Sequence, residues 1–383
     1  MPTRDLIVIG GSAGSLDVLK MLVGGLPPDL PAALCITRHI TAHAPNILPK
    51  ILAKSAMLPT TCAVDGEELR PGHIYVAPPD HHLLVVPGYV RVTRSPTENR
   101  FRPAIDPLFR SAAVAYGPRV VGVILSGALD DGTAGLWAAK QRGGIAVVQD
   151  PQEAQHSSMP QSAITYVPID YCLSAADIAP FLVRLVQEVV EEEGTIPVSD
   201  ELSIETRIAM EDNALESGLM RVGRLTPFTC PECHGTLLQL KAGRFLHFRC
   251  HVGHAFSARS LLTDLSKSLD DTFQSTLRAL EESIMLMQHI AEHLRAEKDL
   301  QTADLFTRRA QEAQKRAELV RHRLERILDK VEEGPAKRIG VERHLFPRGR
   351  PFAPQRHPTL GRLGCHFLED IVHKRSYIRW LSL

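Results

Sequence analysis

The fold is decided by residues 6–14, which read Leu6-Ile7-Val8-Ile9-Gly10-Gly11-Ser12-Ala13-Gly14. Four apolar, strand-forming residues end in a glycine-flanked serine, and a helix-like spacing of apolar residues begins at Leu16. We therefore expect a strand, a tight turn and a helix, with a hydroxyl at the carboxyl end of the strand. In a G-x-S-x-G turn, small neighbours leave the serine oxygen exposed and flanked by backbone N–H groups. The pattern predicts a serine nucleophile.

Two other interpretations of this turn must be weighed. A dinucleotide-binding loop needs G-x-G-x-x-G, but Ser12 stands where the second glycine must allow the pyrophosphate to approach, and no acidic residue follows the next strand, Ala33–Thr37. An isolated G-x-S-x-G can also be a turn without chemistry. The serine therefore needs partners before it can be called a nucleophile.

Composition narrows the class of protein. Lys+Arg and Asp+Glu both number 44 in 383 residues, so no global charge favours nucleic acid or membrane partners. No apolar run approaches the roughly 18 residues of a transmembrane helix, and no secretory signal is recognisable. Seven cysteines cannot all pair, which is typical of a reducing compartment. We expect a cytoplasmic protein of two or three domains that does not insert into membranes and has no nucleic-acid partner.

Residues 5–190 alternate between strand-like and helix-like patterns. Helical stretches follow Ser15, Pro107 and Thr133, and several strands are near-continuous apolar runs, as in a parallel sheet covered on both faces. The middle segment, 73–94, is broken by prolines and predicts antiparallel strands. The expected strands are Leu6–Ile9, Ala33–Thr37, His73–Ala77, Leu83–Val86, Val120–Leu125 and Ile145–Val148. This pattern predicts an α/β domain with a mostly parallel sheet.

The partners of Ser12 are found at other strand ends. His39 follows the strand Ala33–Thr37, and a glycine-rich loop containing Asp130 and Asp131 follows Val120–Leu125. Because the carboxyl ends of parallel strands meet at one edge, these side chains are expected to lie together. The chain order Ser, His, Asp excludes the ordinary α/β-hydrolase, in which the acid precedes the histidine.

Motifs across the whole domain resemble the catalytic domain of CheB-type protein-glutamate methylesterases. They occur in the family's order: Ile9-Gly10-Gly11-Ser12-Ala13-Gly14-Ser15, Arg38-His39-Ile40, Asp65-Gly66-Glu67, Pro71-Gly72-His73-Ile74-Tyr75-Val76-Ala77-Pro78, Asp80-His81-His82, Arg102-Pro103-Ala104-Ile105-Asp106-Pro107-Leu108-Phe109, Val121-Gly122-Val123-Ile124-Leu125-Ser126-Gly127, Asp131-Gly132, Gln149-Asp150 and Met159-Pro160-Gln161-Ser162-Ala163. The resemblance implies a doubly wound, mostly parallel sheet with a small antiparallel hairpin. It also implies hydrolysis of γ-glutamyl methyl esters on methylated receptors, and in some members deamidation of glutamine.

The resemblance assigns roles to individual residues. The nucleophile falls on Ser12, the general base on His39 and the orienting acid on Asp131. Backbone N–H groups of Ala128 and Ala13 would stabilise the oxyanion, and catalysis needs no cofactor. Family members usually carry an amino-terminal phospho-receiver domain. This sequence begins at the catalytic strand, so we expect regulation without one.

The surroundings of the triad depart from the family pattern. Ala13 replaces a threonine beside the nucleophile, and Leu129 replaces a glycine in the loop before the acid. Arg38 stands for glutamine, and Ser158 for glycine. These changes support an alternative function, a catalytically weakened scaffold that binds a partner through its carboxyl-terminal half.

A second cluster has the spacing of a metal site. Cys230 and Cys233 form a C-x2-C pair, and Cys250 with His254 forms a C-x3-H pair. Tetrahedral zinc takes four such ligands, and a unit of about thirty residues gains from a metal because its core is small. His247 and His251 are rival fourth ligands. We expect a structural zinc, and this segment resembles the zinc-ribbon and helical extension of some stand-alone methylesterase-like proteins.

The rest of the chain consists of amphipathic helices and a basic tail. Apolar residues recur with helical period over 257–333, which predicts a helical hairpin or one long coiled coil that could form a homodimer. The tail contains ten Lys+Arg and three acidic residues and is expected to be disordered. The expected divisions are a catalytic domain 1–190, a linker 191–226, a zinc-ribbon-like unit 227–256, helices 257–333 and the tail 334–383.

Overall fold

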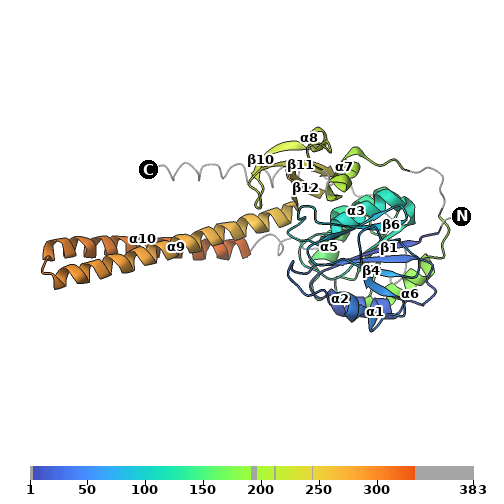
Figure 1. Cartoon of the computed structure of the whole chain (residues 1–383), viewed down its shortest axis with the longest axis horizontal. Coiled ribbons are helices and arrows are strands. Elements are labelled where there is room, and N and C mark those ends of the chain that lie inside the picture. The colour runs from blue at the N-terminus through green and yellow to red at the C-terminus, as the bar shows by residue number, and fades with distance from the viewer. Residues whose placement is uncertain (1–2, 191–195, 211–212, 244, 333–383) are drawn as a thin grey trace. The chain divides into compact units, whose positions relative to one another are not determined.

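A parallel sheet forms the centre of the catalytic half (Figure 1). The structure is a computed structural model that describes residues 3–190, 196–210, 213–243 and 245–332. Within these ranges seven strands share one sheet in the order β3-β4-β2-β1-β7-β8-β9, and every neighbouring pair is parallel. The strands are β1 (Leu6–Gly11), β2 (Ala33–Arg38), β3 (Thr60–Cys62), β4 (Ile74–Val76), β7 (Val120–Ile124), β8 (Ile145–Gln149) and β9 (Tyr171–Leu173).

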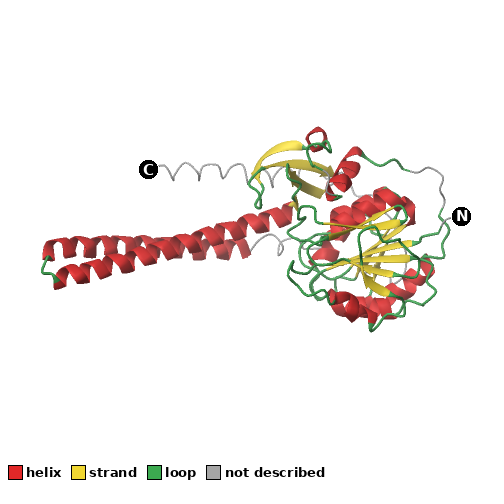
Figure 2. Ribbon diagram, viewed as in Figure 1, coloured by secondary structure: helices red, strands yellow, loops and turns green. Residues whose placement is uncertain are grey.

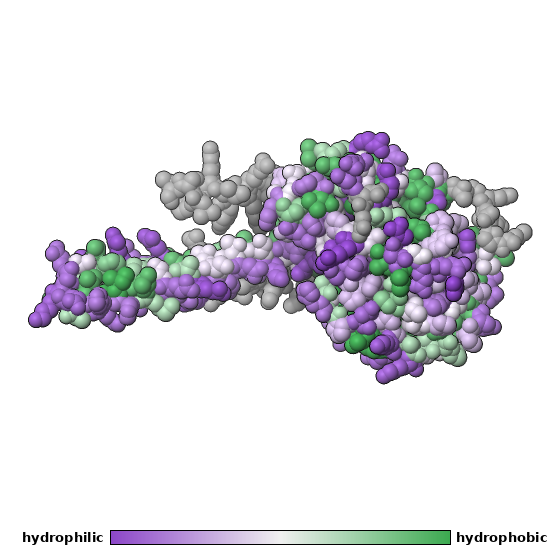
Figure 3. All heavy atoms as spheres, in the orientation of Figure 1, coloured by the Kyte–Doolittle hydropathy of each residue, from purple (hydrophilic) through white to green (hydrophobic). Residues whose placement is uncertain are grey.

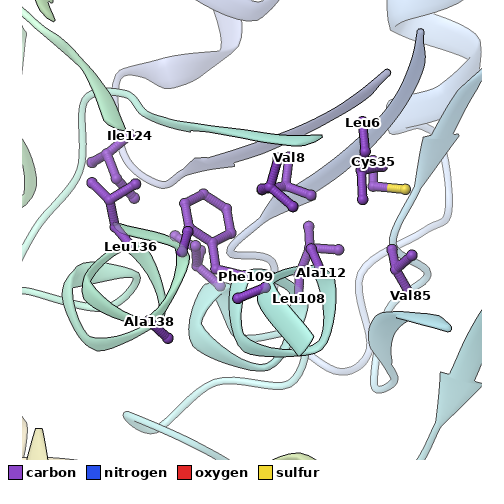
Figure 4. Close-up of a cluster of buried hydrophobic side chains, with 14 of the residues drawn as sticks. Leu6, Val8, Cys35, Val85, Leu108, Phe109, Ala112, Ile124, Leu136 and Ala138 are labelled. Carbon is purple, nitrogen blue, oxygen red and sulfur yellow. The ribbon is translucent and has the colours of Figure 1, made fainter. Parts of the chain in front are cut away.

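Helices cover both faces of this sheet (Figure 2). Leu6 and Val8 of β1 face α3 (Ile105–Tyr116), α4 (Thr133–Gln141) and α5 (Ser158–Tyr166), whereas Ile7 and Ile9 face the other layer. That layer contains α1 (Ser15–Gly24), α2 (Leu48–Ala53) and α6 (Ala175–Leu185). Alternate residues of a strand point to opposite faces, so a continuous apolar run is buried twice. Figure 4 shows the first layer, with Phe109 and Leu136 packed against the strands.

The prediction of antiparallel strands over the whole segment 73–94 was wrong for its first strand. β4 does not belong to an antiparallel group: it pairs in parallel with β2 and β3. Its three residues are fully buried, and the following Pro78-Pro79 ends the strand instead of interrupting a hairpin. The antiparallel hairpin is formed by β5 (His82–Val86) and β6 (Tyr89–Thr93), and β5 packs on α3. The short strands β3 and β9 were not predicted, because three residues show no readable period.

The predicted linker 191–226 contains ordered elements. Helix α7 (Asp200–Ala209) follows the N-cap Ser199 and buries Leu202, Ile204 and Ile208. A short helix, α8 (Leu219–Val222), and strand β10 (Arg224–Thr229) follow, and a 3₁₀ turn, Gly117–Arg119, precedes β7. Helix α7 was not predicted, because charged residues alternate with its few apolar positions and obscure the helical period.

The carboxyl-terminal part begins as a small antiparallel sheet. Its order is β10-β11-β12-β13, with β11 (Thr236–Ala242), β12 (Phe245–Cys250) and β13 (Ala255–Ser257). Helices α9 (Ala258–Ala296) and α10 (Leu300–Glu332) then pack side by side as a hairpin (Figure 1). The chain reverses near Lys298, whose φ is 65°. Of the two arrangements left open by the sequence, the structure has the hairpin.

No described helix combines the length and apolarity needed to cross a membrane. The basic tail predicted at 334–383 lies outside the described residues.

Candidate functional site

The candidate catalytic residues follow three adjacent strands. Ser12 comes directly after β1, His39 directly after β2, and Asp131 lies in the loop after β7. Strand β1 stands between the other two, and the helices that follow β1 and β7, α1 and α4, cover opposite faces of the sheet. Such a switch point at the carboxyl ends of parallel strands opens a crevice where ligands bind.

The turn at Ser12 is held from the neighbouring strand. The N–H of Ser12 donates to the carbonyl oxygen of Ser126 at 2.9 Å, and the Ser126 hydroxyl donates to the Ala13 carbonyl at 2.8 Å. A Cβ at Gly127 would lie 2.9 Å from Cβ of Ser12 and closer still to Met159. Glycine is therefore required at position 127 to let the two loops approach.

Ser12, His39 and Asp131 form a hydrogen-bonded chain. Nδ1 of His39 lies 3.1 Å from Oγ of Ser12, and Nε2 lies 2.6 Å from Oδ2 of Asp131. In the familiar serine-protease triad Nε2 faces the serine and Nδ1 the acid, so the ring is used here with its nitrogens exchanged. The hydrogen-bond network assigns the proton to Nε2, which leaves the Nδ1 lone pair to accept the serine proton.

Asp131 is buried as an anion. Its Oδ2 also accepts from the Ile105 N–H at 2.7 Å, and its Oδ1 accepts from Nδ2 of Asn99 at 2.9 Å. Burial raises the pKa of this carboxyl, but the hydrogen bond and charge of His39, with the donors from Ile105 and Asn99, outweigh it and lower the pKa. An ionised carboxylate in this position holds the imidazole and stabilises its protonated form.

The neighbouring acid, Asp130, has a different environment. It accepts a hydrogen bond from the Ser257 hydroxyl at 2.6 Å and is 1% exposed. Burial raises the pKa of Asp130 to about 6, partly opposed by the Ser257 hydrogen bond. No hydrogen bond joins Asp130 to His39 among the described residues, so Asp131 is the acid that contacts the imidazole.

The candidate oxyanion donors lie on the same two loops. In the described part of the chain, no hydrogen bond occupies the N–H groups of Ala13 or Ala128. Leu129, beside Ala128, has a φ of 62°, a left-handed conformation that costs a bulky residue about 1–2 kcal/mol. This conformation explains why glycine would suit the position, and in this chain leucine adopts it.

Two residues that contact the triad were missed in the sequence. The ring of Phe101 stacks on His39 with centroids 3.7 Å apart and planes 8° apart. Asn99 donates to Asp131, as described above. Both lie in an irregular loop with no periodicity, and the adjoining Arg102-Pro103 motif is the only nearby signal.

The cysteine cluster comes together at the start of the carboxyl-terminal sheet. One ligand atom from each of Cys230, Cys233, Cys250 and His254 lies within 4.8 Å of the others. Sγ of Cys233 is 3.5 Å from Sγ of Cys250, and Nδ1 of His254 is 3.5 Å from the same sulfur. Tetrahedral zinc with Zn–S bonds of about 2.3 Å separates its sulfurs by about 3.8 Å, so three sulfurs and one imidazole suit this metal.

Neither of the two rival histidines belongs to the group of four. Nε2 of His247 pairs with Glu205 at 2.8 Å, and His251 packs beside Gly235. In contrast, Nε2 of His254 lies 3.3 Å from the Glu232 carboxylate while its Nδ1 faces the thiols. A carboxylate behind the ligating imidazole is the usual outer-shell partner of a zinc histidine.

Comparisons with known proteins agree over the catalytic half. The family model of CheB methylesterase matches residues 7–182, which include Ser12, His39 and Asp131. A Leptospira interrogans protein, provisionally named protein-glutamate methylesterase/protein-glutamine glutaminase, is 39% identical over 189 residues, covering 49% of this chain and 98% of that protein.

Two further similarities have the same extent. Protein-glutamate methylesterase/protein-glutamine glutaminase 2 of Anaeromyxobacter dehalogenans is 35% identical over 174 residues, covering 45% of this chain and 51% of that protein. The crystal structure of the Thermotoga maritima CheB methylesterase catalytic domain is 32% identical, with a TM-score of 0.47, and covers 49% of this chain and 100% of its own.

Proposed function

The chain belongs to the CheB methylesterase family, and on this basis we propose that it hydrolyses γ-methyl esters of glutamate on chemotaxis-type receptors. The observation that carries the proposal is the chain of hydrogen bonds from Ser12 through His39 to Asp131. The same chemistry would release ammonia from a glutamine side chain, so glutaminase activity belongs to the proposal.

In the proposed mechanism His39 moves one proton twice. Nδ1 of His39 takes the proton of Ser12 as Oγ attacks the ester carbonyl, while the N–H groups of Ala13 and Ala128 face the oxyanion. The protonated imidazole then gives that proton to the departing methoxy oxygen, and methanol leaves. Water repeats the sequence on the acyl-enzyme, which frees the glutamate carboxylate and restores Ser12. Asp131 keeps the proton on Nε2 throughout and remains ionised.

Methanol release from methylated receptor tests this function. The wild type should release methanol, and Ser12→Ala should lower the rate by about 10⁶-fold, to background. Ser55→Ala, which removes an exposed hydroxyl, is the matched control and should keep full activity. Equal rates from wild type and Ser12→Ala would refute the proposed nucleophile.

We also propose that Cys230, Cys233, Cys250 and His254 hold a structural zinc. The support is their donor set and the carboxylate of Glu232 behind His254. Four protein ligands would close the coordination sphere, so the metal would supply folding energy and no catalytic water. Elemental analysis should find one equivalent of zinc in the wild type and none in Cys230→Ser. Full retention of zinc in that variant would reject the ligand set.

One observation favours partner binding as a second candidate function. Leu262, Leu265 and Leu269 lie exposed along α9. Figure 3 shows a further gathering of apolar side chains toward the far end of the α9/α10 hairpin. We propose that this surface joins two copies of the chain. Light scattering should give twice the chain mass, and Leu265→Glu with Leu269→Glu should give the monomer mass; a monomeric wild type would reject the dimer.

We further propose a cytoplasmic location. The six cysteines in the described residues are all unpaired, which suits a reducing compartment.

A further inference from the structure

Five successive residues of the catalytic half, 97–101, join the carboxyl-terminal part to the triad. The backbone of Asn99 donates to the Ala255 carbonyl at 2.8 Å, and the Ala255 N–H donates to the Thr97 carbonyl at 3.2 Å. Each side chain of the loop then has its own partner: Thr97 with Glu232, Glu98 with Arg249 at 2.8 Å, Asn99 with Ser257 and Ser260, Arg100 with Asp264 at 2.6 Å, and Phe101 with His39. The loop that touches His39 and Asp131 is thus held by residues 232–264.

Asn99 stands at the centre of this connection. Its two N–H donors reach Oδ1 of Asp131 at 2.9 Å and Oδ2 of Asp106 at 3.0 Å. Its oxygen accepts from the Ser257 N–H at 2.7 Å and from the Ser260 hydroxyl at 3.0 Å. An asparagine side chain has two donors and two acceptor positions, so every one is used. The residue is 2% exposed, so the orientation of its side chain is set by these four protein partners.

The conformation of Asn99 restricts which residue can do this. Its φ is 49°, in the left-handed region that asparagine adopts more readily than most residues. Aspartate also tolerates this backbone and could accept from Ser257 and Ser260, but it has no donor for Asp131. Asparagine alone among these choices combines the backbone with both hydrogen-bonding functions.

The carboxyl-terminal side of the connection is the first turn of α9. The Ser257 hydroxyl caps the helix by accepting from the Ser260 N–H at 2.9 Å, and it also donates to Asp130. A capped helix turn has fixed geometry, so the groups that reach Asn99 are rigid. Nearby, Arg249 and Arg110 share the buried carboxylate of Glu98. Removing one partner of such a buried pair would leave an uncompensated charge, so these contacts fix the position of Glu98.

The geometry points to Asn99 as a positioning residue, through which the first turn of α9 orients the Asp131 carboxylate and completes the active site. This inference rests on the proposed esterase function, because the orientation of Asp131 matters for catalysis only if His39 activates Ser12. The carboxyl-terminal part is then a component of the catalytic machinery.

Three full-length variants test the inference. Asn99→Asp removes the donor to Asp131 and keeps the backbone and the acceptor. Ser260→Ala removes one hydrogen bond to Asn99 from the side of α9, and it decides the question if Asn99→Asp fails to fold. Ser268→Ala, an exposed serine two turns further along α9, is the control.

Two measurements are made on each variant. The first is the rate at which a fluorophosphonate labels Ser12. We expect a loss of about 100-fold for Asn99→Asp and about fivefold for Ser260→Ala, with no change for Ser268→Ala. The second is the proton NMR resonance of the His39 Nε2–H bonded to Asp131, downfield of the backbone amides. It should shift or broaden in Asn99→Asp and Ser260→Ala and stay unchanged in Ser268→Ala.

The outcomes separate this inference from the proposed function. If wild-type Ser12 is not labelled, the esterase function fails, but the NMR resonance still reports whether Asn99 orients Asp131. If wild type is labelled and both the rate and the resonance are unchanged in every folded variant at Asn99 and Ser260, the inference is overturned while the esterase function stands.

Discussion

The catalytic half and the carboxyl-terminal part stabilise themselves in different ways. The catalytic sheet is covered on both faces by two large clusters of buried, mostly aliphatic side chains. The small sheet β10–β13 has a minor apolar cluster in which Cys230 and Cys250, two of the proposed zinc ligands, are themselves core residues. The sheet also buries Arg249, which pairs with Glu98 of the catalytic half. The catalytic half therefore has a large apolar core, whereas the small sheet combines a minor core with buried ion pairs and the cluster of proposed zinc ligands.

The largest effect is expected from Asp131→Asn in the catalytic half. The amide cannot hold the His39 proton on Nε2, so kcat should fall by about 10⁴-fold. Asp170→Asn is the matched control. Asp170 pairs with Lys140 at 2.7 Å and lies just before the edge strand β9, away from the strand ends that carry the triad. Steady-state methanol release measures both. A loss of less than tenfold in Asp131→Asn would show that the acid does not orient the base.

Cys250→Ser tests whether the proposed zinc site stabilises the small carboxyl-terminal sheet. If the proposed zinc is bound, loss of one of its four ligands should release it and lower the unfolding free energy of the small sheet by several kcal/mol. The catalytic sheet should stay folded, as judged by circular dichroism, but labelling of Ser12 should slow because residues 97–101 lose their support. Cys62→Ser, outside the cluster, should change neither property. Unchanged zinc content and an unchanged melting temperature in Cys250→Ser would reject the proposed zinc site.

A pair of leucine truncations compares packing in the two parts. Leu22, in α1, is fully buried against the sheet, and Leu277 lies within the α9/α10 hairpin at 8% exposure. Leu22→Ala should lower the unfolding free energy by about 2–5 kcal/mol, and Leu277→Ala by less, because a two-helix hairpin can relax around the lost atoms. Urea unfolding measures both. A larger loss from Leu277→Ala would reverse the comparison.

The smallest effect is a pH dependence at the junction between the two parts. The pKa of Asp130 is raised to about 6 in the folded protein, so its neutral form stabilises the fold at low pH. That contribution is lost as pH rises from about 4 through about 6, and Asp130→Asn avoids the loss. The variant should therefore gain stability over wild type as pH rises, by up to about 3 kcal/mol.

Unfolding in urea between about pH 5 and about pH 8 measures this difference, with Asp271→Asn on the exposed face of α9 as control. A difference between Asp130→Asn and wild type that does not vary with pH would contradict the buried neutral carboxyl.

The sequence predicted those features that have local signatures. Continuous apolar runs predicted the buried strands β1, β7 and β8, and the positions after the predicted strands β1, β2 and β7 pointed to Ser12, His39 and Asp131. The predicted antiparallel pairing of the strand that became β4 was wrong, because a strand of three buried residues carries no signal for its direction. Asn99 and Phe101 were missed because their roles depend on contacts with residues far away in the chain, such as Ser257. A hydrogen bond over 158 positions leaves no periodic trace in either segment.

The most direct test of the central claim is to map the covalent adduct of a fluorophosphonate by peptide mass spectrometry. Wild-type protein should carry the adduct on Ser12, and His39→Ala should remain unlabelled under the same conditions, because without Nδ1 the hydroxyl has no base. An adduct on another residue, or equal labelling of Ser12 in His39→Ala, would contradict a serine activated by this histidine.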